Sequence, residues 1–542
     1  MKMMFQDHIK PDTFLHQYIH GDPKVMEFYD YPLNETGVVK RYEELKSRKF
    51  ERTALVKALL SFNRPLTNSE ATFTQIHRLL DEDSVVVVGG QQAGLLTGPV
   101  YTINKILSIL HEAKMVEEQL EVPVIPIFWI AGEDHDVDEV NHTYFHYLGK
   151  TKKILLHEKN SIKQPVSERK ISIEEAKALL KDAFLFLPET MYTKGLYSDL
   201  IADLNKNEVT YVQWFARIIH RLFKDTGLVL MDAADPNIRN IEKPYFQDLL
   251  KNNDNIRAAF SEGAMQFRNE GFGEPIEINE NNAHIFIHDQ GQRFLLEKEG
   301  SYFKEKNGIN KWTLEALHDL LNSNSSLLSN NVVTRPIMQD KLLPVVSFVS
   351  GPGELMYWGT LKKVFRTMGI CMPLIYPRLH LAFVSRSSEK NLQWMNVEPH
   401  TVTTEGIENH KTRWFNRSSE VDVPKEFQIL SQDLENILIK VENSLKPLGP
   451  DANQIHDRYK KLLKNELNQY EKRVGKYLYD KHRPFLLRFD KVQTELRPNG
   501  NWQERYLNIF PFLNEHGEDL ILQVLKSLPP RNLIGSFLYV YL

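Results

Sequence analysis

Five continuous apolar runs constrain the fold of this chain more than any other feature. Each run is followed within a few residues by Gly, Asp or Pro: Val85–Val88, Val122–Ile130, Leu228–Met231, Leu342–Val349 and Met372–Tyr376. Continuous rather than alternating apolar residues indicate strands that are buried on both faces. Helical patterns lie between the runs, over Pro99–Leu120, Val212–Lys224 and Leu355–Met368. This alternation predicts an α/β fold whose core is a Rossmann-like parallel sheet covered by helices on both faces.

Two insertions interrupt the predicted core. Residues 1–150 form its first part, and the charged segment that follows, SIEEAKALLKDAF included, predicts a helical insertion over 151–210. Residues 211–235 return a helix and a strand to the core. A second insertion of mixed α/β character is expected over 236–330, where HIFIHDQGQRFLLE is typical of a β-hairpin. Residues 331–388 complete the core.

The region 389–500 predicts a coiled coil. Apolar residues recur with heptad spacing in two segments: Phe427, Leu430, Leu434, Ile437 and Val441, then Leu463, Leu467, Tyr470, Val474 and Tyr477. A short loop joins the two segments, so we expect an antiparallel helical hairpin, and two such hairpins are expected to pair in a homodimer. Pro484 is expected to kink or interrupt the second helix. Residues 501–542 are expected to return to the core, ending in the strand-like GSFLYVYL.

Composition excludes several classes of protein. The 542 residues include one cysteine, which excludes a disulfide framework and a multi-cysteine zinc site. A net charge of −4 gives no general attraction to nucleic acid. The N-terminal residues lack a signal-peptide apolar run, and no window has the roughly 20 apolar residues that a membrane span needs. We therefore expect a cytoplasmic protein that binds neither nucleic acid nor membrane.

Polar residues follow all five predicted strands. Because ligands of open parallel sheets bind beyond the carboxyl ends of the strands, these residues predict an active-site cleft there. They are Gln91 and Gln92 after the first strand, Glu133–Asp136 after the second, Asp232 and Asp235 after the third, Ser350, Gly353 and Glu354 after the fourth, and Arg378 after the fifth.

The turn GGQQAGLLTGP is expected to lead into a helix at Gly98-Pro99. The free N–H groups at such a helix start favour a phosphate or a carboxylate. Thr102 and Lys105 share a face of the first turns, and Lys105 would add positive charge. The spacing matches neither the dinucleotide fingerprint nor the phosphate loop. The alternative is a tight turn whose glutamines cap neighbouring backbone.

The segment GEDHDVDEVNHTYFH is rich in acids and histidines. Its carboxylates are suited to an amino group or to sugar hydroxyls, and His135 is suited to act as a general acid or base. On a helix, His142 and His146 would lie on one face, as in a metal site. The H-E-x-x-H pattern is absent, and we predict no metal at the site.

Four blocks now carry a resemblance to a known family: GGQQAGLLTGPVYTINK, GEDHDVDEVNH, TRPIMQDKLLPVVSFVSGPGELMYW and LRPNGNWQER. In this order, and over essentially the whole chain, the sequence resembles the cysteine-adding enzymes (cysteine ligases) of bacillithiol biosynthesis. The resemblance implies an enzyme that joins the carboxyl of L-cysteine to the amine of glucosaminyl-malate. It also implies a core like the catalytic domains of class I aminoacyl-tRNA synthetases, and a coiled-coil domain that mediates dimers.

The resemblance implies carboxylate activation, with ATP as the expected co-substrate. The short His-containing motif with which those synthetases bind phosphates is missing here, so Thr97, Gly98, Tyr101 and Lys105 would have to replace it. After GPGE, family members usually have a small residue following I-A-Y, whereas this chain has the bulkier Leu355-Met356-Tyr357-Trp358. Glu354 and Tyr357 are retained.

The predicted site residues fall into two groups. The catalytic candidates are His135, Asp136 and Lys105. The expected substrate-binding residues are Arg335 and Arg378 for the malate carboxylates, Asp134, Asp136 and Asn141 for sugar hydroxyls, Gln91 and Gln92 to orient cysteine or sugar, and Gly98, Tyr101, Thr102, Glu354 and Tyr357 around them. The sequence indicates no role for Gln503, Glu504 or Arg505.

Two other functions fit the same sequence. A nucleotidyltransferase would use the same core to activate a sugar or small acid without forming an amide. A binding or scaffold protein would be organised by the two charged heptad helices instead. Pyrophosphate exchange that requires cysteine would distinguish the ligase from the nucleotidyltransferase.

Overall fold

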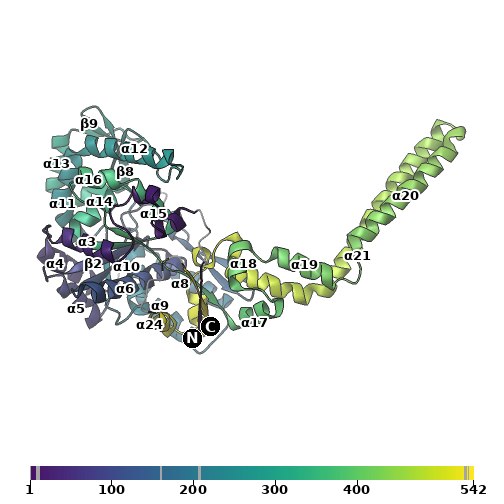
Figure 1. The fold of residues 1–542 in the computed structure, drawn as a ribbon, viewed down its shortest axis with the longest axis horizontal. Helices are drawn as coiled ribbons and strands as arrows, with labels where there is room; N and C mark the ends of the chain where they lie inside the picture. Colours follow the sequence, from purple (N-terminus) through teal and green to yellow (C-terminus); the bar gives the residue numbers. More distant parts are fainter. Residues whose placement is uncertain (1, 8–12, 159–161, 205–208, 530–533, 535) are drawn as a thin grey trace. The chain divides into compact units, whose positions relative to one another are not determined.

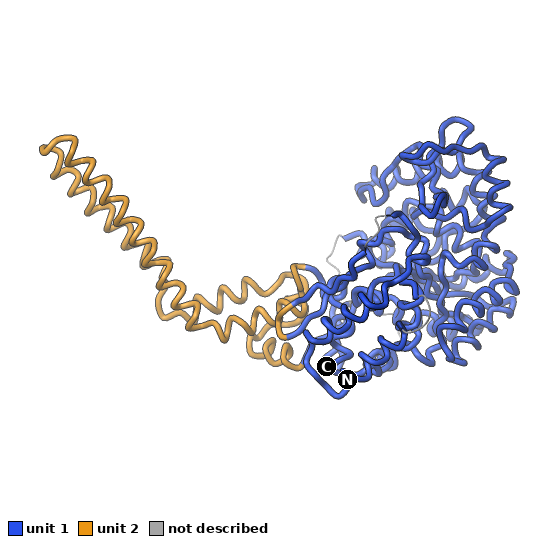
Figure 2. Tube along the Cα trace, turned by 180° about the vertical axis from the view of Figure 1, so that it is seen from behind, with its two compact units in different colours: residues 1–147, 151–385, 501–542 blue, residues 148–150, 386–500 orange. Residues whose placement is uncertain are grey.

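The computed structural model describes residues 2–7, 13–158, 162–204, 209–529, 534 and 536–542. The chain divides into two compact units (Figure 2). Unit 1 comprises residues 1–147, 151–385 and 501–542, and unit 2 comprises residues 148–150 and 386–500. None of the helices in the described ranges is long and apolar enough to cross a membrane.

A five-stranded sheet forms the centre of unit 1 (Figure 1), and every strand pair that it contains is parallel. Its order is β13-β12-β2-β3-β6. The five strands correspond to the five predicted runs, which confirms the Rossmann-like α/β fold: β2 (Val85–Gln91), β3 (Val124–Ile130), β6 (Val229–Asp232), β12 (Val345–Ser350) and β13 (Leu374–Pro377).

The four valines of β2 show why the strands of this sheet have continuous apolar sequences. Val85 and Val87 belong to the hydrophobic cluster on one face of the sheet, whereas Val86 and Val88 belong to the cluster on the other face. The first cluster includes residues of α3 (Glu35–Leu45), α6 (Tyr101–Leu120) and α10 (Tyr211–Leu222). The second includes residues of α4 (Arg52–Asn63), α5 (Glu70–Arg78), α11 (Pro236–Lys251), α12 (Asn253–Asn269), α14 (Thr334–Leu342), α15 (Pro352–Gly359) and α16 (Lys362–Thr367).

The strand order reverses beside β2. From β2 the chain builds outward through β3 to β6, and it then crosses to β12 and β13 on the opposite side of β2. Loops diverge at such a reversal, which leaves a crevice at the carboxyl ends of the strands. The site described below lies at this position.

Two helical expectations in unit 1 need correction. The pattern over 355–368 is split, because α15 ends at Gly359 and α16 begins at Lys362. His142 and His146 lie in a strand rather than a helix: β4 (His142–Tyr147) pairs with β5 (Lys150–Leu155). The acid-rich segment before β4 contributes only the short helix α7 (Val137–Val140). The helices that follow are α8 (Ile173–Phe186) and α9 (Thr193–Leu204).

A second five-stranded sheet, of order β10-β9-β8-β7-β11, lies within residues 282–330. The predicted hairpin is present as β7 (Asn282–Asp289) and β8 (Gln292–Glu299). Gln290 and Gly291 at its turn both have positive φ, 46° and 74°, as a type I′ hairpin turn requires. The remaining elements are β9 (Tyr302–Glu305), β10 (Lys311–Trp312), α13 (Leu314–Ser323) and β11 (Leu328–Asn330).

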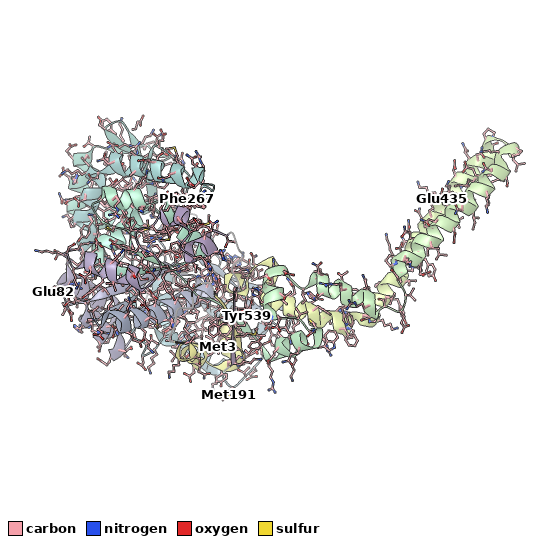
Figure 3. All side chains as sticks on the ribbon, in the orientation of Figure 1. Met3, Glu82, Met191, Phe267, Glu435 and Tyr539 are labelled. Carbon is pink, nitrogen blue, oxygen red and sulfur yellow. The ribbon has the colours of Figure 1, made fainter. Side chains whose placement is uncertain are left out.

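The predicted C-terminal strand is present, in a third sheet rather than in the central one. β15 (Ser536–Tyr541) lies between β1 (Lys2–Asp7), antiparallel to it, and β14 (His380–Val384), parallel to it. Figure 3 labels Met3 and Tyr539 on the two paired strands. The helices near the termini are α1 (Phe14–Ile19), α2 (Pro23–Met26), α22 (Gln503–Tyr506), α23 (Phe510–His516) and α24 (Asp519–Ser527).

Unit 2 is helical and contains the predicted coiled coil. Helices α20 (Val423–Leu445) and α21 (Pro450–Leu496) run side by side (Figure 1). Their pairing is antiparallel, because Phe427 packs on Tyr470 near one end whereas Glu442 approaches His456 near the other. Glu435, labelled in Figure 3, pairs with Lys460 between these contacts. The other helices are α17 (Arg386–Met395), α18 (Pro399–Glu405) and α19 (Glu408–Ser418).

Pro484 lies inside α21 and does not interrupt the helix, whose ribbon bends along its length in Figure 1. The predicted seam differs in part from the structure. Of the predicted seam on α20, Phe427 is buried and Leu434 is half-buried, whereas Leu430, Ile437 and Val441 are exposed. Leu438, which the predicted seam did not include, is buried. On α21 the predicted seam residues Leu463, Tyr470 and Tyr477 are also largely exposed. The apolar pattern therefore covers more than the one face that the hairpin buries.

Candidate active site

A cavity of about 720 Å³ lies at the carboxyl ends of β2 and β3, beside the starts of α14 and α15. This volume is within the range of small-molecule sites, and the position is that expected from the strand order. Residues predicted for the site that line it are Gln91, Gln92, Asp134, His135, Arg335, Glu354 and Tyr357.

Seven other predicted residues are not part of this lining: Gly98, Tyr101, Thr102, Lys105, Asp136, Asn141 and Arg378. Local structure accounts for two of them. Asp136 is the N-cap of α7, where its Oδ1 accepts the N–H of Asp138 at 3.2 Å. The amide of Asn141 donates to the carboxylate of Asp138 at 3.5 Å. The side chains of Asp136 and Asn141 thus form hydrogen bonds within the local turn, whereas their neighbours Asp134 and His135 line the cavity.

Neighbouring strands require the two glycines near the end of β2, Gly89 and Gly90. A Cβ on Gly89 would lie 3.0 Å from the carbonyl oxygen of Val349, and one on Gly90 would lie 2.9 Å from that of Trp129. Any larger residue would push β12 or β3 away from β2. The two glycines therefore allow the strands to pack closely. This packing places the next two residues, Gln91 and Gln92, at the cavity.

The start of α6 is closed by the C-terminal segment. The helix begins at Tyr101, and Gly98 before it has φ +69°. The N–H of Val100 donates to the carbonyl of Leu507 at 2.8 Å. The amide of Asn508 donates to the carbonyl of Gly98 at 2.8 Å and to that of Leu96 at 2.7 Å. Gly98 and Thr102 are buried, so the expected phosphate position at this helix start does not fit the arrangement of these groups.

Lys105 lies directly behind the cavity wall and is 1% exposed. Its ammonium group donates to Glu354 Oε2 at 2.5 Å, to the carbonyl of Gly90 at 2.7 Å and to Gln91 Oε1 at 3.2 Å. A protonated lysine has three N–H donors, and these three acceptors use them all. Burial lowers the pKa of Lys105, and the charge of Glu354 opposes part of that shift. Lys105 thus orients two cavity residues, Gln91 and Glu354.

One wall of the cavity carries carboxylates. The side-chain amide of Gln92 donates to Asp134 Oδ2 at 2.7 Å and also to Glu139. Asp134 has a cation at longer range, since Arg293 Nη1 lies 3.5 Å from its Oδ1. Glu139 has no basic side chain within ion-pair distance among the described residues. This wall is suited to bind an ammonium group or hydroxyl donors.

His135 lies on the same wall and is held as a neutral donor. Arg293 Nη1 lies 3.3 Å from His135 Nδ1, and since a guanidinium only donates, Nδ1 accepts this bond. Burial and the charge of Arg293 both lower the pKa of His135. The neutral ring therefore carries its proton on Nε2. In this arrangement His135 donates a hydrogen bond more readily than it accepts a proton.

A buried ion cluster supports this wall from behind. Glu133 and Glu242 both bind Arg239, the latter at 2.8 Å. Glu133 Oε2 also accepts the N–H of Asn330 at 3.2 Å. Burial raises the pKa of Glu242 to about 7, although Arg239 opposes the shift. Through Glu133, the cluster connects the loop after β3 to Asn330 at the end of β11 and so holds these two segments of the cavity lining in place.

The cavity lining also contains a cation, Arg335. Arg335 donates to Gln339 Oε1 at 2.9 Å and lies 3.5 Å from the hydroxyl of Tyr357. Among the described residues, no carboxylate lies within 4 Å of its guanidinium. By contrast, Arg293 approaches Asp134, and Arg378 is paired with Glu504. Arg335 is thus the cavity cation with a charge available to an anionic ligand.

Several lining residues were missed by the sequence analysis: Trp129, Glu139, Phe286, Arg293 and Asn330. Arg293 and Phe286 belong to the β7–β8 hairpin, and the guanidinium carbon of Arg293 lies 3.7 Å from the ring centroid of Phe286. The sequence did contain one indication of this role: Arg293 lies inside a predicted hairpin strand. A charged residue there needs a partner if it is buried. The sequence did not indicate that this second sheet reaches the cavity.

Among the described residues, no group of three or more His, Cys, Asp or Glu side chains is placed to hold a metal ion. His142 and His146, on β4, do not line the cavity.

Comparison with known proteins connects this chain with one family over nearly its whole length. Residues 1–379 match the family model described as "Bacillithiol biosynthesis BshC, N-terminal Rossmann-like domain", and residues 381–540 match the corresponding "C-terminal coiled-coil domain". A protein of Bacillus licheniformis, named "Putative cysteine ligase BshC", is 37% identical over 96% of each chain. A protein of Bacillus cytotoxicus with the same name is 35% identical over 94% of this chain and 95% of its own.

Proposed function

The chain belongs to the bacillithiol biosynthesis BshC family, and from this premise we propose that it is a ligase joining L-cysteine to glucosaminyl-malate. The bond formed would be an amide between the carboxyl of cysteine and the amine of the sugar, the last step in making bacillithiol. The names of the relatives, putative cysteine ligases, support cysteine as one substrate. The choice of glucosaminyl-malate follows from the family resemblance and from the charges of the cavity.

The observation that carries this proposal is the guanidinium of Arg335, which has no carboxylate partner among the described residues, in the same cavity as the carboxylates of Asp134 and Glu139. Both substrates combine an amino group with carboxylates. Arg335, with the hydroxyl of Tyr357 beside it, is suited to a malate carboxylate, which a guanidinium binds through two N–H donors. Asp134 and Glu139 are suited to an amino group. Arg335 and the two carboxylates would therefore hold the acid and the amine of a substrate in one orientation.

The wall residues also suit the chemistry of amide formation. The attacking amine must lose a proton, and the carboxylates of Asp134 and Glu139 are acceptors for its N–H groups. The carbon–oxygen bond that breaks develops negative charge on oxygen, which a hydrogen bond from His135 Nε2 would stabilise. Holding both reactants in the cavity replaces an encounter in solution by a positioned one.

The oxygen of a free carboxylate must be activated before it can leave. That ATP supplies this activation stays a prediction. The backbone groups before α6 are bonded to Leu507 and Asn508, which does not favour a phosphate at this helix start. Pyrophosphate exchange tests the prediction: exchange that depends on ATP and cysteine together supports a ligase that activates cysteine. Exchange that needs only a sugar or acid substrate would favour the nucleotidyltransferase.

Replacing Arg335 tests the proposal directly. The change Arg335→Gln keeps a polar side chain but removes the charge, and loss of one charged hydrogen bond costs about 1.5–3 kcal/mol. We expect kcat/KM for glucosaminyl-malate to fall about tenfold to a hundredfold, measured as thiol product by mass spectrometry. The matched control is Arg268→Gln, since Arg268 pairs with Glu274 at the surface and lies outside the cavity lining.

Two results would contradict the proposal. Unchanged kinetics of the Arg335→Gln enzyme would remove Arg335 from substrate binding. Absence of any amide product from wild-type enzyme supplied with cysteine, glucosaminyl-malate and nucleoside triphosphates would exclude the reaction itself.

A further inference from the structure

We infer that a clamp of three residues positions the wall of the cavity that carries Asp134 and His135. The clamp consists of Gly132, Ser167 and Asp232, none of which lines the cavity. They are therefore positioning residues, which act through the residues that they hold and touch no substrate themselves. The inference rests on the proposed function and deepens it, because it identifies what keeps the amine-binding side of the site in place.

The backbone of a short segment bonds to two cavity residues. This segment, residues 162–167, lies between β5 and α8, and we call it the strap. The N–H of Val166 donates to the carbonyl of Asp134 at 2.7 Å, and the carbonyl of Lys163 accepts the N–H of Arg293 at 2.9 Å. Asp134 follows β3 of the central sheet, whereas Arg293 lies in β8 of the second sheet. The strap therefore links the backbones of two lining residues that come from different sheets.

This link matters because Arg293 holds His135 from the neighbouring sheet. Its Nη1 lies 3.3 Å from His135 Nδ1 and 3.5 Å from Asp134 Oδ1. Both distances are long for hydrogen bonds, so a small shift of either backbone would break the contacts. A link between the two backbones keeps the guanidinium within reach of both side chains. The strap thus maintains the neutral His135 that the proposed reaction uses as a donor.

Ser167 anchors the end of the strap to the central sheet. Its hydroxyl donates to Asp232 Oδ2 at 2.7 Å, and its N–H donates to the carbonyl of Gly132 at 2.9 Å. Asp232 is the last residue of β6 and is 5% exposed, and its Oδ1 accepts the N–H of Ala234 at 3.2 Å. The strap is thus bonded both to the loop after β3 and to the end of the adjacent strand β6.

Gly132 and Asp232 each have a property that this attachment explains. A Cβ on Gly132 would overlap Ser167 Oγ and Asp232 Oδ1, so only glycine allows the close approach. Asp232 has no basic side chain within ion-pair distance among the described residues. Burial raises the pKa of its carboxyl to about 6, although Ser167 and the N–H of Ala234 oppose the shift. A buried carboxyl without a counter-charge lowers stability, so its bond to the strap gives it a role.

The clamp should not affect the part of the cavity that carries Arg335. This residue lies in α14, and its side chain contacts Gln339 and Tyr357. Within the described part of the chain, none of these three residues bonds to the strap or to the clamp. Loss of the clamp should therefore disturb the amine side of the substrate and leave the carboxylate side intact.

The first experiment follows the pKa of His135 with no substrate present. Burial lowers this pKa, and the charges of Arg293 and Lys163 lower it further. Two carboxylates oppose the shift, those of Asp134 and Asp136. Ser167→Ala releases the end of the strap, which carries Lys163 and holds Arg293. Both cations should then move away and water should reach the ring, so we expect the pKa of His135 to rise toward its ordinary value.

NMR titration of the full-length chain, labelled with carbon-13 histidine, measures this shift, and His135→Gln identifies the signal. The matched control is Ser47→Ala, because the hydroxyl of Ser47 is at the surface and bonds to the nearby carbonyl of Glu44 at 2.7 Å. The control should leave the pKa of His135 unchanged. An unchanged pKa in Ser167→Ala, or an equal change in the control, would overturn the inference and leave the proposed function standing.

The second experiment separates the hydrogen bond of Asp232 from its charge. Asp232→Asn removes the charge, but the new amide can still donate to Ser167 Oγ and accept the N–H of Ala234. Asp232→Ala removes both bonds. We expect the pKa of His135 to stay near its wild-type value in Asp232→Asn and to rise in Asp232→Ala. A rise of equal size in both variants, or no rise in Asp232→Ala, would show that this bond does not hold the strap, and the inference would fail.

The third experiment measures catalysis and binding separately. In Ser167→Ala, kcat for amide formation should fall about tenfold or more, because the amine would meet a displaced wall. Calorimetry compares the binding of an analogue that has hydrogen in place of the sugar amine. Its affinity should not change, since it depends on Arg335. Ser47→Ala should match the wild type in both measurements.

Equal losses of kcat and of analogue affinity in Ser167→Ala would assign the clamp to general stability and would contradict the inference. A Ser167→Ala chain that does not fold would have the same meaning. Absence of amide product from the wild type would contradict the proposed function instead, and the pKa of His135 would still decide whether the clamp positions the wall.

Discussion

Glu504 binds both terminal nitrogens of Arg378, at 2.7 and 2.8 Å, in a fully buried pair. The same carboxylate lies 3.0 Å from His380 Nδ1 and accepts the amide of Asn104 at 2.6 Å. Residues 501–542 thus complete the end of the parallel sheet from a distant part of the sequence. Arg378 is neutralised there, which leaves Arg335 as the available cation of the cavity.

Replacing Glu504 should destabilise unit 1 strongly. Glu504→Gln would leave the guanidinium of Arg378 buried without its counter-charge, and breaking such a pair costs about 3–5 kcal/mol. Urea unfolding followed by tryptophan fluorescence measures the loss. Glu515→Gln is the control in the same segment, because Glu515 is exposed and only approaches His516 at 4.0 Å. Equal midpoints for the two variants would mean that the pair contributes nothing to stability.

The Glu504–Arg378 pair should also make the stability of the protein depend on pH in the acid range. Burial alone would raise the pKa of Glu504, but Arg378 and His380 together lower it well below its usual value. The folded state therefore keeps this carboxylate ionised where the unfolded chain, with a pKa of about 4.3, takes up a proton. The contribution is complete above that pH and is lost as the pH falls further. Wild type should lose stability below about pH 4 more steeply than Glu504→Gln does.

Local sequence signals predicted the central sheet well because they reflect burial. The alternation of Val85 and Val87 with Val86 and Val88 between two cores is a property of one strand, so it can be read from a few residues. The rule that ligands lie at strand ends then placed Gln92, Asp134 and Glu354 correctly beside one cavity. Arg335, shortly before the fourth strand, also lines it.

Long-range pairing explains what the sequence could not reveal. Arg378 has the residue type of an anion ligand, but its partner Glu504 is 126 positions away. The glycine–proline helix start likewise has the features of an anion site until Leu507 and Asn508 cover it. Asn330 and Arg293 reach the cavity from the second sheet, whose position depends on tertiary packing rather than on any local motif.

Lys105 should act by positioning other residues. Lys105→Met removes the donors that hold Gln91 and Glu354, and we expect a loss of about 2 kcal/mol in stability, less than for a fully buried pair, because Glu354 is partly exposed. Product formation should also fall. In a double-mutant cycle, adding Glu354→Gln to Lys105→Met should cost less than Glu354→Gln alone. Strictly additive free energies of unfolding would show that the two side chains are not coupled.

Glu112 should make the protein less stable as the pH rises. This residue of α6 is buried, and burial raises the pKa of its carboxyl to about 8, against a smaller opposing effect of Ser347. Between about pH 5 and pH 8 the folded state holds a proton that the unfolded chain releases, so stability falls by up to about 1.4 kcal/mol per pH unit.

The change Glu112→Gln tests this effect because glutamine stays neutral at every pH. Relative to wild type, the variant should become more stable by roughly 2–3 kcal/mol when urea unfolding is moved from pH 6 to pH 8. Glu118→Gln on the same helix should show no such change, since Glu118 is exposed and only approaches Lys114 at 3.8 Å. Parallel pH profiles for wild type and Glu112→Gln would contradict the prediction.

The exposed apolar side chains of the coiled coil should mediate the proposed homodimer. Leu430, Ile437 and Val441 on α20 are 45%, 56% and 42% exposed, and the hairpin's own seam does not bury them. Exposed apolar groups that recur with heptad spacing are suited to pack against a second helix pair. The mass in solution should therefore be twice the 63.2 kDa of one chain when light scattering is measured after gel filtration.

Leu430→Lys combined with Ile437→Lys should shift the mass to that of a monomer, because two charges cannot be buried in an apolar contact. Ser431→Lys, an added charge at a polar exposed position of the same helix, should leave the mass unchanged. A wild-type mass of one chain, or a dimer that survives the double substitution, would place the contact elsewhere or exclude it.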